Sequence, residues 1–259
     1  MKKFIKSKIN LIFGLSKLFN KIESIDKILK ITLENQEKNS RILHTISNSL
    51  LFQNAINECS WLNYKTFTPG GWAMDNLALH TLLKILNNMK PSKILEFGLG
   101  QSSILIHQYA LFYKNTKALT IEHDKDWIDF FLCSNPEDIK FNIKHLDIKT
   151  VGYKLHNTII YNNLESLVKD SFDLYIVDGP YGSEHYSRSH IIQFVENSLP
   201  SKFCIFMDDS ERNGEKETIK EILKILERNK ILFHLTSFIG EKNNHTIICS
   251  DNIKFLTTT

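Results

Sequence analysis

The stretch Lys93–Ser103, which reads Lys-Ile-Leu-Glu-Phe-Gly-Leu-Gly-Gln-Ser-Ser, constrains the fold of this chain more than any other. Apolar residues around Glu96 predict a short buried strand, and the apolar spacing that continues to Tyr113 predicts a helix. Between them, Gly98 and Gly100 predict a sharp turn, because glycine lets a ligand approach where a Cβ would clash. Strand, glycine turn and helix together predict the first unit of a nucleotide-type α/β domain.

Downstream of this unit, predicted strands alternate with predicted helices, which favours a parallel, doubly wound sheet. The last two predicted strands are joined by a polar turn and indicate an antiparallel hairpin. We therefore expect a Rossmann-like, mostly parallel seven-stranded sheet with a terminal hairpin. The expected strands after the first are 118–121, 141–146, 172–177, 202–207, 231–235 and 246–249, and the clearest helices are 76–89, 188–199 and 214–229.

Residues 1–55 form a separate helical segment, and residues 56–259 form the α/β domain. A seven-residue apolar repeat with a polar middle runs through the first segment, as in a coiled coil. Two interpretations stay open: a helix that joins copies of the protein through residues 4–50, and a long helix that packs on its own domain. The repeat consists of Phe4, Leu11, Leu18, Ile25, Thr32, Asn39 and Ile46 in one series and Leu15, Ile22, Leu29, Gln36, Leu43 and Leu50 in the other.

The first 21 residues are basic, with six lysines and no acid before Glu23. Such a helix either lies on an anionic membrane surface or is the solvated end of the coiled coil. Neither a spanning helix nor a secretory signal is expected, because the apolar runs are too short and no small-residue cleavage site follows. Four scattered cysteines favour buried thiols and a cytoplasmic protein, free or at the inner face of the membrane. A net charge of +3 gives no indication of nucleic-acid binding.

Acidic residues close four of the predicted strands: Glu96, Glu122, Asp178 and the pair Asp208–Asp209. In open parallel sheets the ligand lies at the carboxyl ends of the strands, so these acids are expected to surround it. Each one alone is also explained as a helix cap, but a cap is a poor explanation for all of them. Glu122 follows Gly100 by 22 residues, where an acid accepts hydrogen bonds from a ribose diol.

A nicotinamide-dependent dehydrogenase is one protein class that fits the glycine turn and Glu122. Two features weigh against it. Ser102 stands where such turns often have a third glycine. The acid Glu96, just before the turn, is unfavourable near a pyrophosphate but suits a cationic or amino-bearing ligand.

The motifs Glu96–Gly100, Ile121–Asp124 and Asp178–Pro180, with the terminal hairpin, resemble class I S-adenosylmethionine-dependent methyltransferases over residues 68–250. The Pro69–Trp72 segment is similar to those of bacterial methyltransferases found beside surface-polysaccharide genes. The resemblance implies that the glycines receive the methionine part of the cofactor, with Glu96 near the amino group of that part. It also implies that Glu122 binds the ribose. Trp127 either borders the adenine or is a core residue. Asp147 is implied at the adenine amine. The full implied cofactor set is Glu96, Gly98, Gly100, Ser102, Glu122, His123, Trp127 and Asp178.

Asp178, Asp208 and Asp209 are also similar to the acids that hold magnesium in catechol-type O-methyltransferases. This similarity implies a Mg²⁺ or other divalent ion that holds substrate oxygens and lowers the pKa of the attacking hydroxyl. Here Asp209 stands where the family has an amide, so it either binds the metal or caps the next helix. The alternative is that Asp178 alone is a general base and Asp208 is structural.

The loop 179–188 combines glycine, aromatic, His and Arg residues and is expected to border the acceptor. Within it, His185 is a candidate base or a solvated side chain. Arg188 pairs either with an acidic sugar or phosphate of the acceptor or with a nearby acid such as Glu184. No Asn-Pro-Pro-Tyr motif of amino-methylating enzymes follows the fourth strand, so the resemblance favours an oxygen acceptor. We expect an O-methyltransferase acting on a sugar hydroxyl of a surface polysaccharide or its precursor. The alternatives are an NAD-dependent oxidoreductase and a non-catalytic coiled-coil partner.

Overall fold

The computed structural model describes residues 2–70 and 73–258, and for residues 2–14 and Ser16 it describes the backbone alone. Gly71 and Trp72 of the predicted Pro-Gly-Gly-Trp segment therefore lie outside the described residues.

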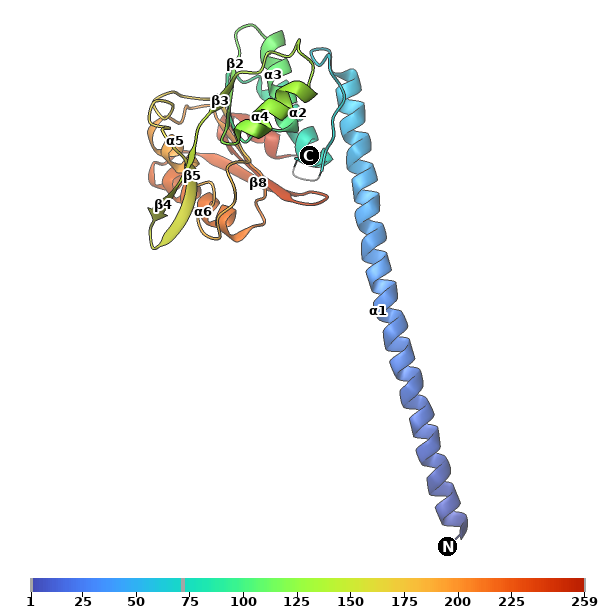
Figure 1. Cartoon of the computed structure of the whole chain (residues 1–259). Helices are drawn as coiled ribbons and strands as arrows, with labels where there is room; N and C mark the ends of the chain where they lie inside the picture. The colour runs from blue at the N-terminus through green and yellow to red at the C-terminus, as the bar shows by residue number, and fades with distance from the viewer. Residues whose placement is uncertain (1, 71–72, 259) are drawn as a thin grey trace. The chain divides into compact units, whose positions relative to one another are not determined.

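The chain divides into two compact units, Met1–Ser47 and Asn48–Thr259. One helix, α1 (Lys2–Glu58), makes up the described part of the first unit and continues into the second (Figure 1). The division falls before the expected residue 55, because Phe52 and Ile56 on the last turns of α1 are fully buried in the core of the second unit.

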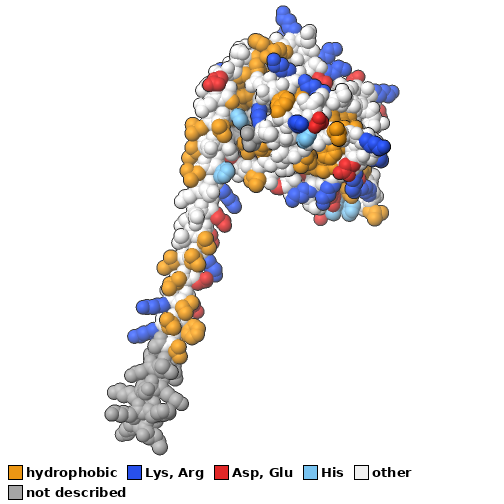
Figure 2. Space-filling view, turned by 180° about the vertical axis from the view of Figure 1, so that it is seen from behind, with side chains coloured by type: hydrophobic (Ala, Val, Ile, Leu, Met, Phe, Trp, Pro, Cys, Tyr) orange, Lys and Arg blue, Asp and Glu red, His pale blue; other side chains and the backbone are white. Residues whose placement is uncertain are grey.

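The apolar side chains of α1 that the structure describes between Leu15 and Ser47 are exposed, and Figure 2 shows apolar side chains spread along this part of the helix. The predicted long N-terminal helix is confirmed, while its pairing as a coiled coil stays a prediction. Phe4, Leu11 and the lysines before Lys17 lie outside the described side chains, so neither that part of the repeat nor the basic face is described. Across the described residues, every helix is too short or too polar to span a lipid bilayer.

The second unit contains a seven-stranded sheet in the order β3-β2-β1-β6-β7-β9-β8. All neighbouring strands are parallel except β9, which runs antiparallel to both β7 and β8. The expected Rossmann-like sheet with a terminal antiparallel hairpin is therefore confirmed. Its strands are β1 (Lys93–Phe97), β2 (Lys117–Glu122), β3 (Ile143–His145), β6 (Leu174–Val177), β7 (Cys204–Met207), β8 (Phe233–Ile239) and β9 (Asn244–Ser250).

The central strands are apolar on both faces, and alternate residues belong to different cores. On β6, Leu174 and Ile176 join the core that contains the end of α1 and the helices α2 and α3, whereas Tyr175 and Val177 join the core of α5 and α6. Helices thus cover both faces of the sheet (Figure 1). They are α2 (Asn76–Met89), α3 (Gln101–Phe112), α4 (Lys125–Ser134), α5 (Ile191–Asn197), α6 (Asn213–Arg228) and the short 3-10 helix η1 (Asp251–Thr257).

A second, two-stranded antiparallel sheet, β4 (Ile148–Tyr153) with β5 (His156–Tyr161), was not predicted from the sequence. Tyr153 pairs with His156, so the turn consists of Lys154 and Leu155. Two-residue hairpin turns are usually recognised in a sequence by Asn-Gly or a similar pair, because these residues readily adopt the positive φ that such turns require. Here Lys154 adopts a φ of 54°, and a lysine gives no such signal in the sequence.

Candidate active site

A cavity of about 560 Å³ opens at the carboxyl ends of β1, β2, β6 and β7, the edge where the sequence predicted a ligand. Its walls come from the segments after these strands, from Tyr161 at the end of β5 and from the turn between β8 and β9. The lining residues are Gly98, Leu99, Glu122, His123, Asp124, Trp127, Tyr161, Asp178, Gly179, Pro180, Tyr181, Gly182, Arg188, Asp208, Asp209, Arg212, Lys242 and Asn243.

Gly98 is required by the packing of two strand ends against each other. Its φ is +99°, and a Cβ there would lie 3.0 Å from the backbone nitrogen of Gly179. A Cβ on Gly179 would in turn lie 2.9 Å from the Cα of Gly98. The turns after β1 and β6 thus meet backbone to backbone, which leaves no room for a side chain. Gly100 is different, since no atom lies within 4 Å of its would-be Cβ.

The N–H groups of the glycine turn are already used within the protein. Gly98 donates to the carbonyl of Ile121 at 2.9 Å, and Gly100 donates to Ser103 Oγ at 3.0 Å. Between them, Leu99 N donates to Glu122 Oε2 at 2.9 Å. A pyrophosphate bound at such a turn needs backbone N–H donors. These three donors point to other acceptors.

Glu96 lies fully buried beneath the turn and is not among the residues that line the cavity. Ser102 Oγ donates to its carboxyl at 2.5 Å, and Ser103 Oγ and Thr120 Oγ1 donate at 2.6 Å each. Burial raises the pKa of Glu96 to about 7 in spite of these three donors. Ser102 is buried in the same network. Both residues organise the turn from below, whereas the resemblance placed them against the cofactor.

Glu122 closes β2 and lines the cavity with its carboxylate held in place. Its Oε1 accepts from the N–H groups of His123 (2.6 Å) and Asp124 (3.0 Å), in addition to the bond from Leu99. Burial alone would raise the pKa of Glu122, but these backbone bonds and the His123 side chain, 2.7 Å away, hold the pKa below its usual range. Glu122 is therefore an ionised acceptor at the cavity wall.

Trp127 on α4 is held against the same turn. Its Nε1 donates to the carbonyl of Leu99 at 2.8 Å, and 39% of the residue remains exposed. The exposed ring of Tyr181, which also lines the cavity, lies 4.4 Å from the ring of His123, measured between centroids. The cavity therefore offers an aromatic surface next to the Glu122 carboxylate.

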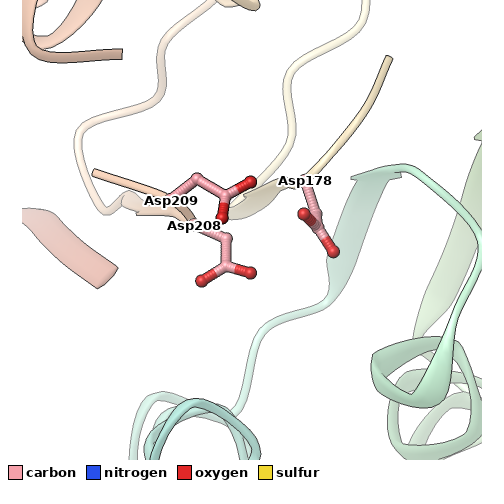
Figure 3. Close-up of side chains that lie close together, drawn as sticks. All are labelled: Asp178, Asp208 and Asp209. Carbon is pink, nitrogen blue, oxygen red and sulfur yellow. The ribbon is translucent and has the colours of Figure 1, made fainter. Parts of the chain in front are cut away.

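The three predicted aspartates come together at the opposite wall. One carboxylate oxygen from each of Asp178, Asp208 and Asp209 lies within 4.8 Å of the others. Figure 3 shows Asp178 at one strand end beside the Asp208–Asp209 pair. Because β6 and β7 are parallel neighbours in the sheet, the residues that follow them meet at the same edge.

Arg188 lies among these acids, and it is only 3% exposed. Its Nη2 is 2.7 Å from Asp209 Oδ2 and 3.3 Å from Asp178 Oδ1. Its Nη1 donates to the carbonyl oxygen of Asp208 at 2.9 Å. Of the two interpretations of Arg188 from the sequence, the structure supports pairing with nearby acids of the protein: the guanidinium is buried, and these acids are Asp178 and Asp209, two of the predicted metal ligands.

Two carboxyl groups at this wall, those of Asp178 and Asp208, have raised pKa values. Burial, opposed by Arg188 and reinforced by the charge of Asp209, raises the pKa of Asp178 to about 7. Burial and the neighbouring Asp178 and Asp209 charges also raise the pKa of Asp208. Since 23% of the Asp178 side chain remains exposed and it lines the cavity, Asp178 is placed to exchange a proton near neutral pH.

These residues do not fit a divalent cation as they stand. Both carboxylate oxygens of Asp209 are already paired, one with Arg188 and the other with Arg212 at 2.8 Å. Asp178 also has one oxygen facing Arg188. A hard cation such as Mg²⁺ needs free carboxylate oxygens and no like charge beside them.

His185 lies apart from the cavity lining. Its Nδ1 is 3.1 Å from Glu217 Oε1 on α6, and its ring stacks on His156 of β5 at 3.9 Å between centroids. The predicted role of His185 as the catalytic base does not fit this position. Asp147, which the resemblance placed at the adenine, has an exposed side chain next to His145 and is not part of the lining either.

Several lining residues were missed from the sequence. Tyr161 ends the unpredicted strand β5, while Lys242 and Asn243 belong to the turn between β8 and β9. That turn was predicted, and the antiparallel pairing of β9 with β7 brings it to the ligand edge of the sheet. The polar composition of this turn could have indicated that it contributes residues to the cavity.

No protein-family model matches this chain, and no curated protein is similar to it. Among solved structures, it is similar to the SAH-bound methyltransferase PaMTH1 of Podospora anserina, with 13% identity over 84% of this chain and 97% of that one and a TM-score of 0.47. It is also similar to a putative caffeoyl-CoA O-methyltransferase from Staphylococcus aureus (16% identity, 83% and 99% covered, TM-score 0.44). An O-methyltransferase from Bacillus cereus in complex with SAH gives 13% identity, 80% and 90% covered, and a TM-score of 0.43.

Proposed function

We propose that this protein is an S-adenosylmethionine-dependent O-methyltransferase. The observation that carries the proposal is the cavity wall after β1 and β2. It presents an ionised carboxylate, Glu122, and an aromatic face, Trp127, while the N–H groups of the glycine turn are used internally. A ribose diol and an adenine ring match the carboxylate and the aromatic face.

The two walls of the cavity together disfavour the dehydrogenase alternative. A dinucleotide carries a pyrophosphate, which would face the carboxylates of Asp178, Asp208 and Asp209 without backbone donors from Gly98–Gly100. S-adenosylmethionine instead carries a sulfonium cation, which an acidic cavity stabilises. The non-catalytic alternative is disfavoured by a cavity that keeps both an ionised acid and an acid with a pKa near 7.

In the proposed reaction Asp178 is the general base. An oxygen lone pair of the acceptor hydroxyl attacks the methyl carbon, the carbon–sulfur bond breaks, and its electron pair stays on sulfur. The hydroxyl proton passes to the Asp178 carboxylate, and S-adenosylhomocysteine leaves. The protein has to align oxygen, methyl and sulfur and accept that proton, because the sulfonium already makes the methyl group reactive.

We further propose that the acceptor is a sugar hydroxyl of a surface polysaccharide or its lipid-linked precursor, and that the reaction takes place in the cytoplasm. The acceptor class rests on the resemblance in sequence. Polar groups of Arg212, Lys242 and Asn243 line the cavity beyond Asp178 and are suited to hydrogen bonding with a glycan.

Isothermal titration calorimetry of the full chain with S-adenosylmethionine and with NAD tests the proposed cofactor. We expect one S-adenosylmethionine per chain and no heat from NAD. The Glu122→Ala variant is expected to lose S-adenosylmethionine affinity, whereas Asp126→Ala, a nearby exposed acid on α4, is expected to keep it. Binding of NAD without S-adenosylmethionine would favour the oxidoreductase.

We also propose that α1 joins copies of this chain. From Leu15 to Leu50 its apolar residues recur at coiled-coil spacing and are about half exposed, and a second copy offers the same repeat and the same polar layer at Thr32, Gln36 and Asn39. Isolated, such an apolar stripe is unfavourable in water.

Sedimentation velocity of the full chain tests this assembly. We expect an oligomer that the Leu29→Lys variant weakens and that Asn20→Lys, on the opposite face of the repeat, leaves intact. A wild-type chain that is monomeric at micromolar concentration and floats with anionic vesicles would instead support the membrane contact of residues 1–21.

A further inference from the structure

We propose that the guanidinium of Arg188 is the permanent cation of the acidic wall, standing where a divalent metal was expected, so that this site binds no divalent cation. The inference concerns metal binding by the free protein and does not depend on the proposed methyl transfer.

The contacts of Arg188 are those of a bridging cation. Through Nη2 it joins Asp178 Oδ1 (3.3 Å), which follows β6, to Asp209 Oδ2 (2.7 Å), which follows β7. Through Nη1 it binds the carbonyl oxygens of Val177 (3.3 Å) and Asp208 (2.9 Å) at the same two strand ends. Its Nε lies 3.7 Å from Glu215 Oε1, an acid that is fully buried. The guanidinium therefore tethers the two strand ends, which is the task a metal would perform here.

Charge explains why a buried cation is needed and why a divalent ion directly beside it is disfavoured. The cluster holds four acids, Asp178, Asp208, Asp209 and Glu215, of which all but Asp178 are nearly or fully buried. Buried carboxylates are stable only when they are paired or neutralised. A divalent ion bound by the remaining oxygens would lie within a few ångströms of the guanidinium, and like charges repel strongly in a desolvated site.

The position of Arg188 is built into the fold. The loop before α5 is anchored to α6, since Thr218 Oγ1 donates to the carbonyl of Ser187 at 2.6 Å. A Cβ on Gly214 would lie 2.8 Å from the Cβ of Ser187, so the loop and the start of α6 pack without a gap. Arg188 itself has a φ of 57°, a left-handed conformation that a non-glycine residue adopts at a cost. A side chain held this firmly is part of the wall and is not a mobile contact for the acceptor.

Titration of the chelator-treated full chain with Mn²⁺, followed by electron paramagnetic resonance, tests the inference. We expect no stoichiometric binding up to about 100-fold excess over the chain. One equivalent of Mn²⁺ bound by the wild type, and lost in the Asp208→Asn variant, would overturn it.

Variants at position 188 distinguish a cation from a mere structural contact. Arg188→Met removes the charge, so the vacated acids are expected to bind one Mn²⁺. Arg188→Lys keeps the charge, and the matched control Arg212→Met leaves Arg188 in place, so neither is expected to bind it. Mn²⁺ binding by the Lys variant would contradict the charge argument. Should the Met variant fail to fold, the wild-type and Lys titrations still decide.

Discussion

The two walls of the cavity are built by different means. The wall after β1 and β2 is held by neutral donors: backbone N–H groups fix Glu122, and three hydroxyls surround Glu96. The wall after β6 and β7 is held by charge, with one buried guanidinium, that of Arg188, contacting Asp178, Asp209 and Glu215. Both walls contain an acid whose pKa is raised to about 7, Glu96 in the first and Asp178 in the second.

The difference between the walls separates binding from chemistry. Glu96 is fully buried and satisfied by its own neighbours, so its proton has no route into the reaction. Asp178 lines the cavity, so the same shift in pKa gives a usable base. A raised pKa becomes functional only where the group faces the space that the substrate enters.

The sharpest way to test this contrast is to remove the proton acceptor. The Asp178→Asn variant is expected to lose roughly 10²- to 10⁴-fold in kcat, the usual contribution of a general base. Because the base acts when deprotonated and burial sets its pKa to about 7, wild-type kcat/KM is expected to rise as the pH increases through 7. A methyl-transfer assay over pH 5.5–9 measures both effects. An unchanged rate and profile in Asp178→Asn would show that the two walls do not differ in this way.

Arg188→Met tests how much of the second wall depends on one charge. Removing one partner of a buried ion pair typically costs about 3–5 kcal/mol, because the other charges stay buried and uncompensated. We expect a loss of that size in the free energy of unfolding, measured by urea denaturation at pH 7. The control Arg212→Met removes an arginine that is 45% exposed in its side chain, and about 1 kcal/mol or less is expected. Equal losses would contradict the central place given to Arg188.

Glu96→Gln tests the first wall through the pH dependence of stability. Burial raises the folded-state pKa of Glu96 from 4.5 to about 7, so the folded protein binds this proton more tightly than the unfolded chain. The resulting stabilisation is full below pH 4.5 and is lost as the pH rises through 7, a change of about 3 kcal/mol.

Unfolding in urea at pH 5 and at pH 8 measures this effect. The titration of Glu96 is expected to make the wild type more stable at pH 5 than at pH 8. Other groups that titrate in this range contribute equally to the wild type and to Glu96→Gln. In Glu96→Gln the difference between the two pH values should shrink by about 2.5 kcal/mol, because part of the stabilisation is already lost at pH 5, while Asp178, which shifts in the same direction, keeps the rest. A variant with the wild-type difference would show that Glu96 is not the group that titrates.

The smallest effect is expected at His185. Its ring pairs with Glu217 and stacks on His156, away from both walls. We expect His185→Gln to keep kcat within about twofold, the range of surface substitutions. A loss of more than tenfold in kcat, with unchanged stability, would indicate that His185 takes part in the reaction although it lies outside both walls.

The first wall could be predicted from the sequence to a large extent, because its parts are close in the chain. The Lys93–Ser103 stretch forms the strand, turn and helix that its apolar and glycine pattern indicates, and Glu122 ends the next strand. The pattern did not reveal which way the side chain of Glu96 points. Glu96 turns away from the cavity because the hydroxyls of Ser102, Ser103 and Thr120 donate hydrogen bonds to its carboxyl group from beneath.

The second wall could be predicted only in part. The positions of the three aspartates after two predicted strands indicated that they lie close together, and in the structure their carboxylates do. The partners of Arg188 were not predicted, because an arginine in a loop is usually expected to face the solvent. Here the loop packs against α6, which buries the guanidinium. The β4–β5 hairpin and Tyr161 were missed because Lys154 and Leu155 carry no turn signal. Charge pairing and tolerated strain depend on tertiary structure, and local pattern does not encode them.

Calorimetric titration of S-adenosylhomocysteine into the chelator-treated full chain, with and without added Mg²⁺, tests the central claim most directly. The account predicts one binding site per chain and the same Kd in both buffers, because the first wall binds the cofactor and Arg188 already occupies the position of a cation in the second. Absence of binding in both buffers, or binding that requires Mg²⁺, would contradict it.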